Sequence, residues 1–263
     1  MVSVGIDAGT QFIRIVIMRG NAIVATHITT LGSEAIENVA SANYASVLKN
    51  TNLLPQDIAC VAVTGIGREY IDFSDYQFSE AVCSARGVHW LDTEADVLLD
   101  MGTEKTMVVK IEQGKPTHIL RNDRCASGTG RFLAITAKPL GVTPEELGEL
   151  AGRSTKNIFI NNNCAVFAES EIISLIHRNE RKEDIARAIF MSMAAKVHSL
   201  LIKVEPFAAL MMIGWLAKNK GMVDAVRALT GYNVLIPHAI DPQFVTALGA
   251  AVAGGDAYIK NVR

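Results

Sequence analysis

The chain has 263 residues, with 25 Lys and Arg against 27 Asp and Glu and a net charge of −2. This length is enough for two structural units with a sizeable core. The nearly neutral charge argues against nucleic acid or an anionic membrane surface as the main partner. The sequence also shows no secretory signal and no apolar run long enough to span a membrane, so it predicts a cytoplasmic protein without a membrane segment.

The first elements in chain order are strands joined by a turn, Asp7-Ala8-Gly9-Thr10, and the same pattern returns around Asp100-Met101-Gly102-Thr103. Asp, Gly and Thr each recur at an offset of 93 residues. The strands expected around the two turns span residues 12–18, 22–26, 97–99, 106–111 and 117–120. A repeat with this internal order predicts two duplicated mixed α/β lobes.

The remaining elements fill out both copies. We expect a helix over residues 33–49 that Ser33 caps, a buried strand over 58–64, and a helix whose capping box is Thr143-Pro144-Glu145-Glu146. Further helices are predicted over 81–87, 166–178, 183–203, 221–230 and 243–260, and strands over 211–213 and 234–236. The expected lobes span residues 1–94 and 95–263, and the last helix is a candidate to pack back on the first lobe.

Turns of the type Asp-x-Gly-Thr can bind phosphate. Backbone and hydroxyl groups of Gly and Thr can wrap phosphate oxygens, while the Asp carboxylates orient a hydrated Mg²⁺. A single such turn is more often an ordinary hairpin corner, but duplication favours one nucleotide site that uses both turns. The residues proposed for it are Asp7, Gly9, Thr10, Asp100, Gly102 and Thr103.

Two of the four cysteines lie where a polar loop enters a predicted helix, namely Cys125 and Cys164. The positive end of the helix dipole favours a thiolate there, so both suit a ligand role. Cys60 and Cys83 lie in apolar or mixed elements and are expected to be buried. From the residues alone, two unrelated free thiols is the favoured interpretation of Cys125 and Cys164, with zinc as the next alternative.

The duplicated turns resemble the actin, Hsp70 and sugar-kinase superfamily. The resemblance implies an actin-like, ribonuclease H-like fold with a cleft between two lobes, in which ATP or ADP binds. In that superfamily a later Gly-Gly turn contacts the adenosine. The matching segment here runs from Ile213 to Asn219, so Gly214 and Lys218 become candidate nucleotide-binding residues, while Trp215 replaces the second glycine.

The cysteine segments resemble a narrower family. Asn122-Asp123-Arg124-Cys125-Ala126-Ser127-Gly128-Thr129-Gly130 and Cys164-Ala165-Val166-Phe167-Ala168-Glu169-Ser170-Glu171 are similar to the BadF/BadG/BcrA/BcrD ATPases, which include activators of 2-hydroxyacyl-CoA dehydratases and ATP-binding subunits of benzoyl-CoA reductase. This resemblance implies an oxygen-sensitive homodimer with one [4Fe–4S] cluster, held by Cys125 and Cys164 of both copies. Ferredoxin or flavodoxin would reduce it, and ATP would drive one electron to a dehydratase or reductase partner.

The second turn departs from that family, whose loop usually reads Asp-Ile-Gly-Gly-Gln-Asp. Here Thr103-Glu104-Lys105 follows Gly102, so the Glu104 carboxylate would act as a base near the terminal phosphate or repel it. Two alternatives therefore stay open. The first is a small-molecule kinase of the same fold, and the second is a divergent ATP-sensing or cluster protein that does not hydrolyse ATP.

Overall fold

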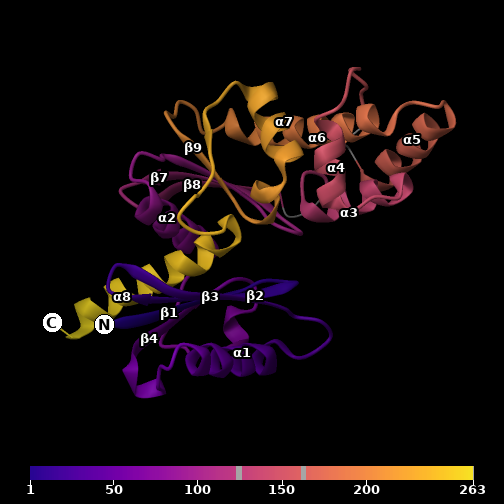
Figure 1. The fold of residues 1–263 in the computed structure, drawn as a ribbon. Coiled ribbons are helices and arrows are strands. Elements are labelled where there is room, and N and C mark those ends of the chain that lie inside the picture. The colour runs from indigo at the N-terminus through magenta and orange to yellow at the C-terminus, as the bar shows by residue number, and fades with distance from the viewer. Residues whose placement is uncertain (123–125, 161–163, 263) are drawn as a thin grey trace. The chain divides into compact units, whose positions relative to one another are not determined.

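The computed structural model describes residues 1–122, 126–160 and 164–262. The chain forms two compact units. The first unit comprises residues 1–95, 111–117 and 238–263, and the second comprises residues 96–110 and 118–237. The ribbon in Figure 1 shows that each unit combines strands with helices.

The two sheets have the same strand order. The strands of the first are β1 (Val2–Ala8), β2 (Phe12–Arg19), β3 (Ala22–Thr30), β4 (Ile58–Thr64) and β5 (Tyr76–Gln77), arranged β3-β2-β1-β4-β5. Those of the second are β6 (Val97–Met101), β7 (Thr106–Glu112), β8 (Lys115–Asn122), β9 (Leu210–Ile213) and β10 (Val234–Leu235), arranged β8-β7-β6-β9-β10. In each, the first strand pairs antiparallel with the second and parallel with the fourth. The predicted duplication is confirmed.

The helices follow the predicted pattern closely. The first unit contains α1 (Ile36–Asn50), α2 (Glu80–Leu91) and α8 (Val245–Val262). The second contains α3 (Gly130–Ala137), α4 (Pro144–Ala151), α5 (Ala165–His177), α6 (Lys182–Leu201) and α7 (Lys220–Thr230). Short 3-10 turns span Pro55–Asp57, Arg68–Tyr70, Lys138–Leu140, Trp215–Lys218 and Pro242–Phe244. Within the described part of the chain, no helix is both long and apolar enough to cross a bilayer.

The helix caps test the sequence predictions in detail. Thr143 accepts a hydrogen bond from the Glu146 N–H, and the Glu146 carboxylate accepts one from the Thr143 N–H, so the predicted capping box is confirmed. The prediction for Ser33 was wrong. The helix begins only at Ile36, after Ala35, because Gly32 takes a φ of +62° and the chain turns there before the helix starts.

Helices cover both faces of the first sheet. On one face, Val4 and Ile6 pack with Val39 and Val47 of α1 in one apolar core. On the other face, α8 lies so close to β1 that a side chain at Gly5 would overlap the Ala247 carbonyl oxygen. In Figure 1, α1 and α8 lie on opposite sides of this sheet. Successive residues of β1 therefore face opposite helices, with Val4 and Ile6 toward α1 and Gly5 toward α8.

The contact between α2 and α8 depends on glycine. A methyl group at Gly249 would overlap the backbone carbonyl oxygen of Cys83, and one at Gly87 would overlap that of Val245. Hydrogen in place of a side chain lets the two helix backbones approach, and the small residues around Gly249 are buried in this contact. Close helix packing thus accounts for the small-residue segment of α8.

We expect Gly249→Ala to destabilise the protein by about 1–3 kcal/mol, because overpacking against a rigid backbone outweighs the gain in helix propensity. The matched control is Gly152→Ala, where the nearest atom to a new methyl group is 3.5 Å away and φ is −65°. Urea unfolding of both variants measures the difference. An unchanged midpoint for Gly249→Ala would contradict the close approach of α8.

Candidate functional site

The first predicted phosphate turn follows β1. Asp7 is buried and forms an ion pair with Arg14 across the β1–β2 pairing, at 3.3 Å between the guanidinium nitrogen and the carboxylate. The Gly9 N–H donates to the Phe12 carbonyl at 3.0 Å, which closes the turn, while Thr10 is exposed at its tip. The turn thus offers an exposed hydroxyl above a buried charged pair.

The second turn copies the first in its backbone. The Gly102 N–H donates to the Lys105 carbonyl at 3.0 Å, the bond that Gly9 and Phe12 make one repeat earlier. Asp100 and Thr103 are half-buried. Glu104 has a partner: its carboxylate lies 3.6 Å from the Arg131 guanidinium. This pairing offsets the negative charge that Glu104 brings to a loop expected to meet phosphate.

Gly214, in the candidate adenosine turn, lies against the second loop. The φ of Gly214 is +85°, and a Cβ atom there would lie 2.6 Å from the Asp100 carboxylate and 2.7 Å from the Met101 carbonyl oxygen. Gly214 is therefore needed both for its backbone angle and for space. Lys218 is exposed at the end of the following 3-10 turn, Trp215–Lys218. The structure thus brings Gly214 and Asp100 into contact.

Trp215 fills the space beside the same loop. Its ring packs against the start of α3, where a methyl group on Gly130 would lie 2.7 Å from two ring carbons. The ring also contacts the apolar core of the second unit. Trp215 is therefore a packing residue of this unit, half-buried against the start of α3.

Sequence reasoning missed the bonds between the second loop and α3. The Gly130 N–H donates to the Gly102 carbonyl at 3.0 Å, and the Arg131 N–H donates to the Thr103 carbonyl at 2.7 Å. The Thr106 hydroxyl donates to the Gly128 carbonyl at 2.7 Å and holds the chain just before the helix. The Gly128-Thr129-Gly130 segment was the available signal, because glycine allows so close an approach of two backbones.

Of the two cysteines proposed as cluster ligands, the structure describes only Cys164. Cys125 lies outside the described residues. Cys164 is a free, half-buried thiol directly before the first turn of α5. The N–H groups of that turn lack helical partners and carry the positive end of the helix dipole, so they could donate to the sulfides of a cluster. Among the described residues, no three His, Cys, Asp or Glu side chains gather into a metal site.

Cys60 and Cys83 are confirmed as buried, at 1% and 0% exposure. Burial raises the pKa of the Cys60 thiol to about 11 and that of the Cys83 thiol to about 12, because a thiolate is poorly solvated in the interior. Nearby carboxylates add to both shifts, that of Asp75 for Cys60 and that of Asp7 for Cys83. Neither thiol is suited to bind a metal.

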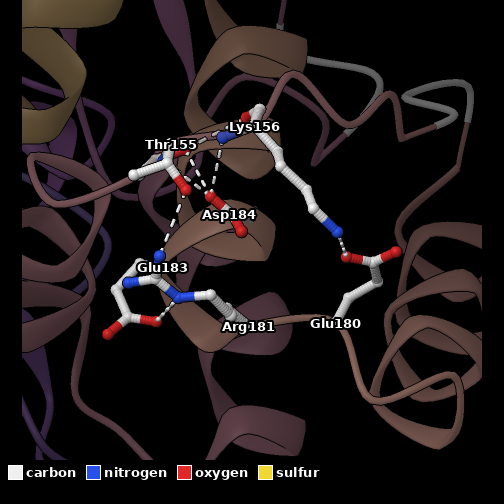
Figure 2. Close-up of polar contacts among 7 residues, drawn as sticks. Thr155, Lys156, Glu180, Arg181, Glu183 and Asp184 are labelled. Atoms are coloured by element: carbon white, nitrogen blue, oxygen red, sulfur yellow. Dashed lines mark hydrogen bonds and ion pairs between the residues drawn. The ribbon is translucent and has the colours of Figure 1, made fainter.

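The chain before Cys164 is anchored by Asp184, at the start of α6 (Figure 2). One oxygen of this buried carboxylate accepts hydrogen bonds from the Ser154 hydroxyl and from the N–H groups of Thr155 and Lys156, at 2.9, 2.8 and 3.0 Å. These bonds, that from Thr155 foremost, lower the pKa of Asp184 against the opposing effect of burial. The residues leading toward Cys164 therefore start from a fixed point.

Two ion pairs surround this anchor. The Lys156 ammonium lies 2.9 Å from the Glu180 carboxylate, and Arg181 donates to the Thr155 hydroxyl at 3.1 Å while lying 3.5 Å from the Glu183 carboxylate. Figure 2 shows these side chains gathered around Asp184. Thr155 and Lys156 follow α4, Glu180 and Arg181 precede α6, and Glu183 lies in its first turn. The turn after α5 and the segment before it are thus joined.

The fold and the two loops define an actin-like ATPase fold. Residues 4–254 match the BadF/BadG/BcrA/BcrD ATPase family, and the chain belongs to this family. It is therefore an ATP-binding protein of an ATPase family.

Several relatives match over the whole length. The chain is 36% identical over 258 residues to the 2-hydroxyisocaproyl-CoA dehydratase activator of Clostridioides difficile, covering 97% of this chain and 96% of the relative. The crystal structure of component A of (R)-2-hydroxyglutaryl-CoA dehydratase from Acidaminococcus fermentans matches with a TM-score of 0.93, 32% identity and full coverage of both chains. A structure of the Clostridium difficile activator with bound ADPNP matches with a TM-score of 0.91 and 34% identity, covering 100% and 97% of the two chains.

We expect Gly214→Ala to weaken ATP binding about tenfold or more, because the methyl group would displace Asp100 in the second loop. Gly231→Ala is the matched control, since its φ of +72° imposes the same backbone strain with open space around the new methyl group. Titration with a fluorescent ATP analogue measures both. Equal affinities in the two variants would contradict a role for the Gly214–Asp100 contact.

A second prediction concerns thiol reactivity in the folded, cluster-free protein at pH 8. Cys60 and Cys83 stay protonated, since pH 8 lies well below their raised pKa values, and iodoacetamide should therefore modify them slowly. Cys164, half-buried at a helix start, should react much faster. Peptide mass spectrometry over a time course reads out each site, with urea-unfolded protein as the control. Rapid labelling of Cys83 before Cys164 would contradict the assignment.

Proposed function

We propose that this chain is an ATP-driven activator that donates one electron at a time to a 2-hydroxyacyl-CoA dehydratase or a related CoA-ester reductase. The support is the combination of whole-length similarity to activators with a free cysteine at the start of α5. In this proposal ferredoxin or flavodoxin supplies the electron, and the protein acts in an anaerobic cytoplasm.

A [4Fe–4S] cluster is proposed to be the electron carrier, because bound iron and sulfide supply one-electron chemistry that protein side chains lack. A cubane cluster takes four thiolates, and one chain offers two suitable ones, Cys125 and Cys164. Two copies of the chain would therefore complete the ligand set. The N–H groups at the start of α5 would stabilise the added negative charge.

The surface around Cys164 favours a homodimer. Phe159 is 88% exposed, and Val166 and Phe167 are each 65% exposed, all three within five residues of Cys164. Large apolar side chains that are exposed close together in a chain often mark an interaction site. We propose that this apolar surface is covered when two copies meet at the cluster.

The nucleotide roles are proposed residue by residue. Asp7 and Asp100 would orient a hydrated Mg²⁺, and the two loops would hold the phosphates through Gly9, Thr10, Gly102 and Thr103. Gly214 and Lys218 would contact the remainder of the nucleotide. Glu104 would act near the terminal phosphate, with its charge tempered by Arg131.

The test is iron and sulfide analysis with an ultraviolet–visible spectrum of protein purified without oxygen. We expect a brown protein with about two irons and two sulfides per monomer, one cluster shared by two chains. Cys125→Ser and Cys164→Ser should each lose the colour. Cys60→Ala is the matched control and should keep it, because that thiol is buried in β4.

Other outcomes separate the alternatives. A colourless wild type that cannot be reconstituted with iron and sulfide would overturn the redox proposal. Phosphate transfer from ATP to an added small metabolite would then favour a kinase of the same fold. A cluster-bearing protein with no ATP turnover would instead indicate a divergent member that binds ATP without hydrolysing it.

A further inference from the structure

The two phosphate loops are copies in backbone but differ in their neighbours across the sheets. In the first unit Asp7 stands between Arg14 on β2 and Thr64 on β4. In the second unit Asp100 stands between Met107 on β7 and Ile213 on β9. Residues in register on adjacent strands share one face of a sheet. Asp7 therefore lies in a polar row, while its counterpart lies between two apolar side chains.

Thr64 is the unusual member of that row. Its side chain is fully buried, and its hydroxyl has no oxygen or nitrogen partner among the residues that the structure describes. Its polar neighbour is the Cys83 thiol, whose pKa a hydrogen bond from Thr64 lowers against the larger effect of burial, but sulfur is a weak acceptor. A buried hydroxyl without a good partner costs stability, so its presence calls for a bound water or ligand.

Arg14 gives the row a fixed geometry. One guanidinium nitrogen lies 3.3 Å from the Asp7 carboxylate, both side chains are only 11% exposed, and the guanidinium packs over the Phe12 ring at 5.3 Å. The Arg14 Nε is also buried without a partner in the described residues. Polar atoms in need of partners thus flank Asp7 on both sides, and the second unit has no equivalent of them at Met107 and Ile213.

We infer that the Thr64 hydroxyl and the Asp7 carboxylate together bind one water molecule, and that this is the water that attacks the terminal phosphate of ATP. The inference rests on the proposed use of ATP by this chain. It assigns the positioning of the attacking water to the first loop, beside Arg14 and Thr64.

In this step the water oxygen bonds to the terminal phosphorus as the bond from that phosphorus to the bridging oxygen breaks. ADP leaves with the bridging oxygen and its electron pair, and inorganic phosphate forms. The proton released by the water passes to the Asp7 carboxylate and then to solvent. Thr64 contributes position: its hydroxyl donates to the water oxygen or accepts from it, and so limits the directions in which the water can attack.

The test compares Thr64→Val with Thr64→Ser in steady-state phosphate release from ATP and in thermal unfolding. Valine has nearly the shape of threonine but no hydroxyl, so we expect kcat to fall about 10- to 100-fold with KM unchanged. The Tm should stay the same or rise, because the variant removes a buried group without a partner. Serine keeps the hydroxyl and should restore most of kcat.

Thr136→Val is the matched control. Thr136 is equally buried, but its hydroxyl already donates to the Phe132 carbonyl at 2.9 Å within α3. This variant should leave kcat unchanged without raising the Tm. The contrast separates loss of a water site from loss of an ordinary buried hydroxyl.

The remaining outcomes are distinct. Wild-type kcat in Thr64→Val would overturn the inference and leave the proposed ATPase function in place. A fall of both Tm and kcat in the valine and serine variants alike would make Thr64 a purely structural residue. A wild type that releases no phosphate from ATP would overturn the proposed ATP use, and the inference with it.

Discussion

The loop after β6, residues 102–105, and the first turn of α3 are joined by backbone hydrogen bonds, and the packing around this junction depends on them. The carbonyls of Gly102 and Thr103 accept from the first N–H groups of the helix, so neither segment is satisfied without the other. Trp215 closes the same junction by packing on Gly130. A displacement of the loop would therefore directly displace the start of α3, because the two segments share these bonds.

The two units have the same backbone arrangement around their first strands but different side chains beside the Asp of each turn. The strand order, the turn after the first strand and the closing bond of that turn are all repeated. What differs is the chemistry beside each Asp, with an Arg and a Thr in one copy and apolar residues with a glycine in the other. Backbone geometry is conserved because it fixes the fold, while the adjacent side chains are free to specialise.

The sequence predicted what depends on local pattern. The offset between Asp7 and Asp100 was enough to predict two similar mixed α/β units, and Thr143 with Glu146 predicted a helix start correctly. Prediction from the sequence failed where a contact is made by residues distant in the chain. The hydrogen-bond partners of Asp184 come from a segment about 30 residues earlier, and nothing near Gly130 in the sequence indicates that a Trp ring packs against it. The start of α1 failed for a local reason, since a glycine turn at residue 32 displaced the expected cap.

The anchor at Asp184 also defines a module. Lys156 and Glu180 meet in an ion pair, so the chain leaves this point, forms α5 and returns to it. The ion pair is not the only hold on this helix, because Ala168 and Ile172 on α5 are buried in the apolar core of the second unit. The helix is therefore held where the chain returns to Lys156 and along one of its faces, and a substitution at either place acts on α5 as a whole.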